Sequence, residues 1–234
     1  MQEQQEKFFL SRRVTKNNQM INGKAALTAM QYCVFSACVA TVEYNAGEFA
    51  DAEITINQIL GKEKLSKTDY SHVKTAALGL VDASIKIQVG KKWKGVPLFQ
   101  YIEGEDGTNM IRFRFNVEMT PFLLKLKEQG NFTAYKYGYL TLLKKNMYAM
   151  RVYELLKQHE NFGQRKITLE EFREILILSD KYPRFGELNR TVIKPVLDLL
   201  KKTDLLVDFS TIKRGRTVTH LLFKIQQRYK TIKE

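Results

Sequence analysis

A five-residue motif occurs twice in this chain, and the same order of predicted elements follows each copy. The copies are Ile54-Thr55-Ile56-Asn57-Gln58 and Ile167-Thr168-Leu169-Glu170-Glu171, which lie 113 residues apart in a sequence of 234 residues. Each copy places a threonine three residues before Gln or Glu, the pattern of a capping box at the start of a helix. After each copy the sequence predicts a helix, a loop, a second helix, a strand, a basic turn and a returning strand. The repeat therefore indicates two domains of one fold.

This order of elements is typical of a winged helix, which is a helix-turn-helix followed by a β-hairpin. The second helix of each pair, the recognition helix, is predicted at 67–82 and at 188–202. The hairpins are predicted around basic turns at 90–95 and 211–216, and an acidic turn at 103–107 joins further strands at 96–101 and 110–117. Other helices are predicted at 24–42 and through most of 132–158.

We therefore predict an α+β fold with two tandem winged-helix domains, 1–118 and 119–234. The boundary is expected within 116–130, where Pro121 suits the first turn of a short connecting helix. Pro195 lies inside the second recognition helix, where it should remove a backbone hydrogen bond and kink the axis.

The charge distribution predicts a nucleic-acid partner. The chain has 38 Lys and Arg against 25 Asp and Glu, a formal charge of +13. Residues 181–230, which span the second recognition helix and wing, contain 12 basic and four acidic residues. In a winged helix the recognition helix enters the major groove and the wing lies on the backbone, so these cations are placed to neutralise phosphates.

The residues expected to contact DNA lie in the recognition helices and the basic turns. In the helices they are Lys67, Ser71, Lys74 and Thr75 in the first half, and Arg184, Asn189, Arg190 and Lys194 in the second. In the turns they are Lys91, Lys92 and Lys94, and Lys213, Arg214 and Arg216. Side chains such as Asn189 and Arg190 suit base readout, since Asn pairs with adenine and Arg with guanine. The turn residues are expected to bind phosphates.

No catalytic set is visible, so we expect no enzymatic activity, cofactor or metal. His72, His159 and His220 show no metal-binding spacing, and no phosphate-binding glycine loop with its lysine is present. Cys33 and Cys38 cannot bridge on one helix and suit a reducing cytoplasm. The uncharged segment 25–42 is interpreted as a core helix, not a membrane span, and no signal peptide is expected.

The second half resembles the plasmid replication initiators that bind iterons, over roughly residues 119–226. The first matching segments are Phe132-Thr133-x-Tyr135, Leu143-Lys144 and Tyr148-x-x-Arg151-Val152-Tyr153-Glu154-Leu155-Leu156-Lys157-Gln158. The next are Ile167 to Arg173, Tyr182, Phe185, Asn189-Arg190-x-Val192-Ile193-x-Pro195 and Lys202-Thr203-Asp204. The last are Lys213-x-Gly215-Arg216-x-Val218 and Phe223-x-Ile225. The resemblance also accounts for Pro195, because the family has a proline inside this helix.

The resemblance implies a bacterial protein of the cytoplasm, associated with a plasmid or the nucleoid, that binds repeated origin sites in double-stranded DNA. It further implies help in opening the origin and recruitment of a host initiator ATPase and the replicative helicase. It also implies a homodimer in equilibrium with monomer, formed through the first domain and repressing its own gene. The segment 25–42 and exposed strands of that domain are the expected dimer contact.

Two alternatives remain open at this point. A winged-helix transcriptional repressor without replication activity would fit the same residues, but it would bind one operator instead of iterated repeats. A plasmid or phage nicking enzyme would need a metal-binding histidine pair, for which the sequence has no pattern.

Overall fold

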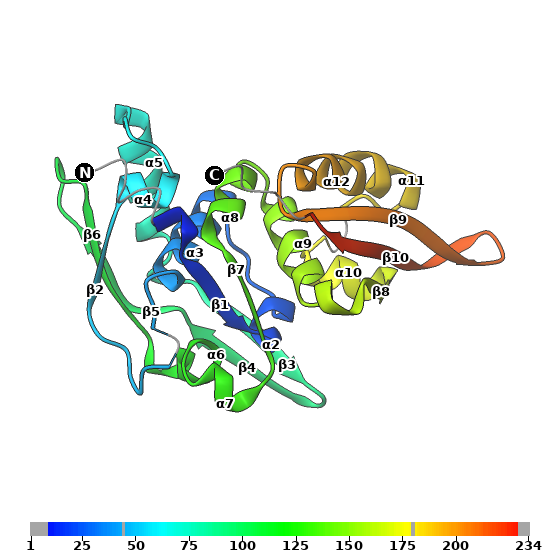
Figure 1. Cartoon of the computed structure of the whole chain (residues 1–234), viewed down its shortest axis with the longest axis horizontal. Coiled ribbons are helices and arrows are strands. Elements are labelled where there is room, and N and C mark those ends of the chain that lie inside the picture. Colours follow the sequence, from blue (N-terminus) through cyan, green and yellow to red (C-terminus); the bar gives the residue numbers. More distant parts are fainter. Residues whose placement is uncertain (1–8, 44, 179–180, 229–234) are drawn as a thin grey trace. The chain divides into compact units, whose positions relative to one another are not determined.

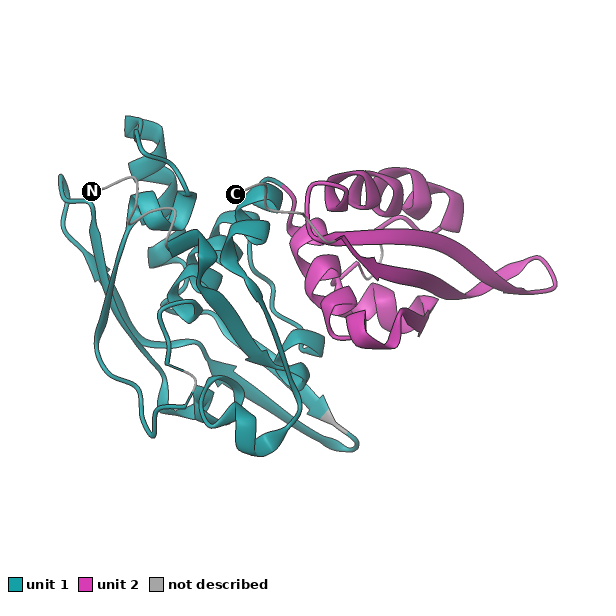
Figure 2. Cartoon of the chain, in the orientation of Figure 1, with its two compact units in different colours: residues 1–145 teal, residues 146–234 magenta. Residues whose placement is uncertain are grey.

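The structure, a computed structural model, describes residues 9–43, 45–178 and 181–228. The chain forms two compact units, Met1–Lys145 and Asn146–Glu234, coloured separately in Figure 2. The predicted division at 118/119 thus lies inside unit 1. The segment 119–145 packs with the first unit because β7 (Phe132–Lys136) pairs antiparallel with β1 (Arg13–Asn17).

Unit 1 carries short helices around small antiparallel sheets (Figure 1). After β1 come α2 (Asn18–Asn22), α3 (Ala29–Val39), β2 (Ala52–Thr55), α4 (Ile56–Leu60) and α5 (Lys67–Leu78). Four strands follow: β3 (Ser84–Val89), β4 (Lys92–Pro97), β5 (Phe99–Gly104) and β6 (Met110–Phe115). The unit continues with η1 (Val117–Met119), α6 (Thr120–Leu123), α7 (Leu126–Gln129), β7 and α8 (Tyr137–Leu143).

The core of unit 1 is built on α3. Residues Tyr32 to Val39 of this helix are all buried, and Thr28 with Gln31 caps its start. Five rings, Phe35, Phe49, Phe99, Phe113 and Phe115, pack with centroids 4.9–6.1 Å apart, mostly edge to face. The buried stretch Tyr32 to Val39 therefore offers no exposed side chain for the dimer contact that is predicted through segment 25–42.

Unit 2 contains α9 (Met147–Lys157), η2 (Glu160–Phe162), β8 (Gln164–Thr168), α10 (Leu169–Ile175) and α11 (Phe185–Leu188). It continues through η3, a π turn over Asn189–Ile193, then α12 (Lys194–Leu200), β9 (Leu205–Arg214) and β10 (Thr217–Gln227).

The predicted helix over 132–158 is wrong at its start, which belongs to unit 1. There Thr133 and Tyr135 point inward from alternate positions of strand β7.

Pro195 sits at the first turn of α12, directly after the π turn. A proline in an α-helix removes one hydrogen bond and its ring clashes with the carbonyl four residues back. Here the Lys194 amide donates to the Asn189 carbonyl five residues back, so the helix widens before the proline. The recognition helix of unit 2 is thus one run from α11 to α12 with a widened turn at its centre.

The two units repeat one topology, as the sequence predicted. In unit 2 the sheet order is β8-β10-β9, and in unit 1 it is β2-β6-β5. Each helix pair starts with a capping threonine: Thr55 Oγ1 accepts from the Gln58 amide at 3.2 Å, and Thr168 Oγ1 accepts from the Glu171 amide at 3.0 Å. Both units are therefore winged helices.

The topology also corrects which hairpin is the wing of unit 1. The counterpart of β9–β10 is β5–β6, because each hairpin returns to pair with the strand that precedes the helix pair. The basic hairpin β3–β4 forms a separate two-stranded sheet between α5 and β5. The wing of unit 1 therefore ends in the acidic turn at 103–107, and the predicted basic wing is an additional element.

Candidate nucleic-acid interface

The recognition helix of unit 2 presents most of its predicted contacts to solvent. Arg184 precedes α11, Arg190 lies in the π turn and Lys194 starts α12, and all three are exposed. Asn189 is only partly exposed, and its Oδ1 is buried with no hydrogen-bond partner in the described part of the chain. A base contact by Asn189 would therefore require its side chain to turn outward, whereas Arg190 already faces solvent.

The loop before this helix is held by Arg173, which ends one of the segments that resemble the family but is not among the predicted DNA contacts. Its guanidinium donates to the backbone carbonyls of Lys181 at 3.0 Å, of Tyr182 and of Pro183. Tyr182 has a positive φ of 57°, a conformation unusual for a residue with a side chain. Arg173 thus fixes the entry to α11 from the preceding helix α10.

The end of the recognition helix is held by Asp204. Tyr153 Oη donates to Asp204 Oδ1 at 2.9 Å, and Lys157 Nζ donates to Asp204 Oδ2 at 3.0 Å. Both donors lie on the buried face of α9. The Asp204 carbonyl also accepts from the Arg228 amide at 2.7 Å, just beyond β10. Asp204 therefore ties together α9, the exit from α12 and both ends of the wing.

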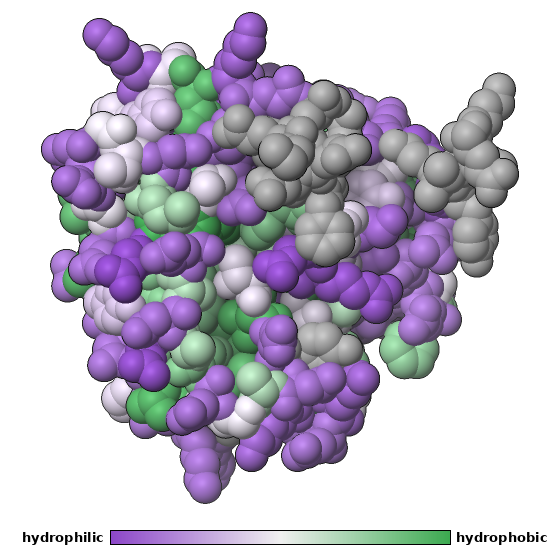
Figure 3. Space-filling model, turned by 60° about the vertical axis from the view of Figure 1, so that its left-hand side comes forward, coloured by the Kyte–Doolittle hydropathy of each residue, from purple (hydrophilic) through white to green (hydrophobic). Residues whose placement is uncertain are grey.

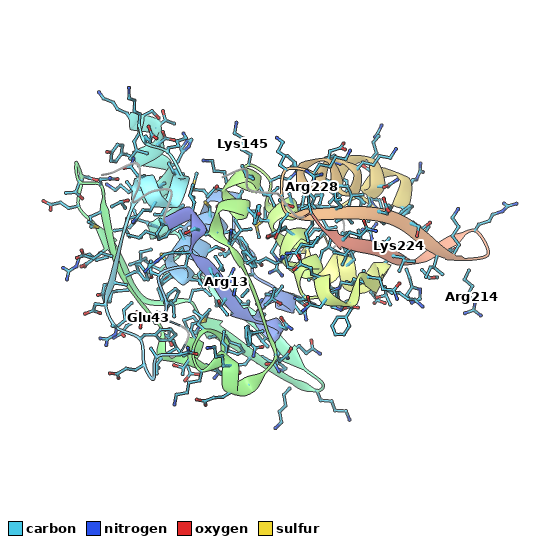
Figure 4. All side chains as sticks on the ribbon, viewed as in Figure 1. Arg13, Glu43, Lys145, Arg214, Lys224 and Arg228 are labelled. Carbon is cyan, nitrogen blue, oxygen red and sulfur yellow. The ribbon has the colours of Figure 1, made fainter. Side chains whose placement is uncertain are left out.

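The wing of unit 2 is a long hairpin that carries basic residues to its tip. Arg214 and Arg216 flank Gly215, whose φ of +61° makes the turn, and Lys213 pairs with Val218 across the strands. All three cations are exposed. Figure 4 shows Arg214 at the far end of the hairpin and Lys224 further back along β10. This geometry suits contact with DNA phosphates on either side of a groove.

The recognition helix of unit 1 is exposed at all four predicted positions, but one of its cations is paired. Lys67, Ser71, Lys74 and Thr75 lie on α5 and face solvent. Lys74 Nζ donates to both carboxylate oxygens of Asp106, at 2.6 and 2.8 Å. Asp106 belongs to the acidic wing turn, so a carboxylate of the unit 1 wing neutralises a lysine of the recognition helix in the same unit.

The remaining predicted contacts of unit 1 lie on the β3–β4 hairpin. Lys91, Lys92 and Lys94 are exposed near its tip, and Lys94 forms an ion pair with Glu118. These lysines therefore lie on an element separate from α5 and from the β5–β6 wing.

Figure 3 shows hydrophilic side chains over most of the face in view, with smaller apolar areas between them.

The described residues carry neither a metal-binding cluster nor a membrane-spanning helix. Within 9–43, 45–178 and 181–228, no group of three or more His, Cys, Asp or Glu could hold a metal ion. No helix in these residues is long and apolar enough to cross a membrane.

Two winged helices in one chain, with basic groups exposed on a recognition helix and a wing, define a tandem winged-helix DNA-binding protein. The family of initiator replication proteins matches in two parts: its WH1 model covers residues 13–157 and its WH2 model covers residues 168–225. The chain belongs to this family of replication initiators, as the resemblance in its second half predicted.

Two known proteins are similar to this chain, one in sequence and one in fold. The chain is 28% identical over 227 residues to a replication initiation protein of Escherichia coli, covering 91% of this chain and 69% of that protein. A crystal structure of the Pi initiator protein in complex with iteron DNA has the same fold. It matches with a TM-score of 0.78 and 18% identity, over 94% of this chain and 99% of that one.

The start of α5 generates a prediction about pH. Lys62 Nζ donates to Asp69 Oδ1 at 2.7 Å, and the Ser66 amide donates to Asp69 Oδ2 at 2.9 Å. These bonds lower the pKa of Asp69 from 3.8 to about 2. The folded pKa of Asp69 lies below its unfolded value. The contribution of this carboxylate to the free energy of unfolding is therefore complete above about pH 5, and it is lost as the pH falls through the folded pKa.

We therefore expect Asp69→Asn to lower the free energy of unfolding by about 0.5–1 kcal/mol at neutral pH. The difference from the unsubstituted protein should shrink as the pH falls below about 4. Urea denaturation across this range measures it, with Asp198→Asn, an exposed partner of Lys201, as the control. A difference that stays constant with pH would show that the Asp69 carboxylate contributes nothing through its charge.

Proposed function

We propose that this protein initiates plasmid replication by binding directly repeated sites in double-stranded DNA. The observation that carries the proposal is the exposed basic surface on the recognition helix and wing of unit 2, within a chain of the replication initiator family. A relative of the same fold has been crystallised with iteron DNA. These basic residues would bind DNA phosphates and supply affinity. Arg190, in the major groove, would contact base edges and supply sequence specificity.

We propose that one chain places both recognition helices on one face of the duplex, in successive major grooves. Groove faces recur about every 10–10.5 base pairs, so each repeat would be about two turns long. Unit 2 supplies most of the affinity, because the Lys74–Asp106 ion pair and the acidic wing reduce the positive charge that unit 1 offers. We expect the protein to act by binding DNA. Opening of the adjacent DNA and recruitment of a host ATPase and helicase would come after that binding.

Footprinting on the DNA that flanks its own gene tests the proposal. A ladder of evenly spaced protected repeats, each about two turns long, supports initiation. A single protected palindrome would instead favour the second candidate, a winged-helix repressor without replication activity. Protection of only one groove per repeat would show that unit 1 does not read DNA.

The dimer is part of the same proposal. With α3 enclosed in the core, we propose contact through an edge strand of the sheet β2-β6-β5, where β2 and β5 lie at the two edges. Monomers would bind repeats, and dimers would bind inverted half-sites near the gene and repress it. Sedimentation over a concentration series up to about 50 micromolar, the range of weak association, should show a rising mass. A constant monomer mass throughout that range excludes the dimer.

Within unit 2, base-reading and phosphate-binding residues should respond differently to substitution. Arg190→Ala should cost about 1–3 kcal/mol on the cognate repeat and little on scrambled duplex, because the absence of a bidentate base contact penalises only the correct sequence. Arg214→Ala or Arg216→Ala should weaken both duplexes alike and lower the salt slope by about one for each phosphate that is no longer neutralised.

Binding of each variant to repeat and scrambled duplexes at several salt concentrations measures this difference. If Arg190→Ala weakens binding equally on both duplexes, Arg190 binds phosphate and the recognition helix does not lie in the groove as proposed.

The acidic wing of unit 1 generates the opposite expectation, a gain of affinity. Asp106→Asn should free Lys74 and remove a negative charge near the DNA. Exposed ion pairs contribute about 0–1 kcal/mol, so affinity for the repeat should rise by up to about fivefold, and the salt slope should increase by about one. Glu53→Gln is the matched control, since Glu53 pairs with Arg112 at 3.2 Å on strands outside α5. Equal effects of the two variants would show that Lys74 does not bind DNA.

A further inference from the structure

The β3–β4 hairpin has no counterpart among the described residues of unit 2, and it carries the only tryptophan of the chain. Trp93 is 84% exposed, more than any other large apolar side chain among the described residues. An indole ring that makes so little contact with its own domain keeps most of its apolar area available for a ligand. The predicted duplex contacts include lysines of this hairpin but not the Trp93 ring.

The register places Trp93 on the outer face of the hairpin. Ile85, Ile87 and Val96 are buried and define the inner face. Because side chains alternate along a strand, Trp93 faces outward with Gln88, its partner across the hairpin, and with Gly95 two residues on. A side chain at Gly95 would meet nothing within 4 Å. The ring therefore stands beside open space on the outer face of the hairpin.

The charges around the ring are all of one sign within the hairpin. Residues 84–97 include four lysines and no Asp or Glu. Lys94 is paired with Glu118. Lys86, Lys91 and Lys92 are exposed and have no carboxylate partner in the part of the chain that the structure describes. An aromatic platform among unpaired lysines is the combination that binds unpaired bases together with their phosphates.

We propose that the outer face of the β3–β4 hairpin binds single-stranded DNA, with one unpaired base stacked on Trp93. Lys86, on the same face as the ring, and Lys91, in the adjoining turn, bind the flanking phosphates. A duplex cannot use this surface in the same way, because its base faces are covered by their neighbours in the stack. The site would hold a strand released when the duplex opens, and it is separate from the two recognition helices.

The single tryptophan makes the test direct. Titration with a 20-nucleotide oligothymidylate should quench the fluorescence of Trp93, and a matched duplex should quench it much less. With a labelled oligonucleotide, Trp93→Ala should weaken single-strand binding by about ten- to a hundredfold, and Trp93→Tyr should keep most of it. Phe162→Ala is the control, because Phe162 is 77% exposed on unit 2.

Duplex binding to the repeat should be the same for Trp93→Ala and the unsubstituted protein, so this test can fail without affecting the proposed function. Equal quenching by single strand and duplex would overturn the proposal in favour of a duplex contact. Unchanged oligonucleotide affinity in Trp93→Ala would also overturn it. Quenching or a blue shift with phosphatidylglycerol vesicles, but not with oligothymidylate, would instead make the hairpin a membrane-surface contact.

Discussion

The hydrogen bonds around Asp204 set the geometry on which DNA contact by unit 2 depends. A buried carboxylate needs partners, and Tyr153 and Lys157 provide them from α9 at 2.9 and 3.0 Å. Asp204 stands between α12 and β9, so this one residue fixes where the recognition helix ends and where the wing begins. Loss of one partner from a buried charged network costs about 3–5 kcal/mol, which is comparable with the stability of a small domain.

The same arrangement explains two segments that the resemblance had matched separately. The α9 segment around Tyr153 and the segment Lys202-Thr203-Asp204 lie about fifty residues apart in the sequence, yet they meet through these hydrogen bonds. Arg173 has a parallel role at the other end of the recognition helix, where it holds the loop carbonyls from Lys181 to Pro183. Both ends of the helix are thus positioned by side chains that belong to other elements of unit 2.

Unit 1 has the same topology but a different distribution of charge. Its wing turn is acidic where that of unit 2 is basic, and Asp106 holds Lys74 of the recognition helix. Four of its lysines lie instead on the additional hairpin β3–β4, which also carries Trp93. Two copies of one fold have therefore placed their basic residues on different elements, which is consistent with different DNA contacts.

Features that depend on neighbours in the sequence were predictable. The capping threonines Thr55 and Thr168, and the helix pairs that they start, follow from local spacing. Features that depend on distant pairing were not. Nothing local in 132–136 indicates that it pairs with β1, and the choice between two hairpins as the wing of unit 1 depends on which one reaches β2. The Lys74–Asp106 pair and the inward turn of Asn189 likewise require the folded chain.

The central claim is that both recognition helices lie in major grooves of one repeat, and tethered cleavage tests it most directly. A DNA-cleaving iron chelate would be attached in turn to Ser71→Cys on α5 and Thr191→Cys in the π turn. Both positions are exposed, whereas Cys33 and Cys38 are buried and protected from the reagent. The two variants should cut the repeat at centres about 10–10.5 base pairs apart on one face. Specific cutting from position 191 with none from position 71 would contradict the claim.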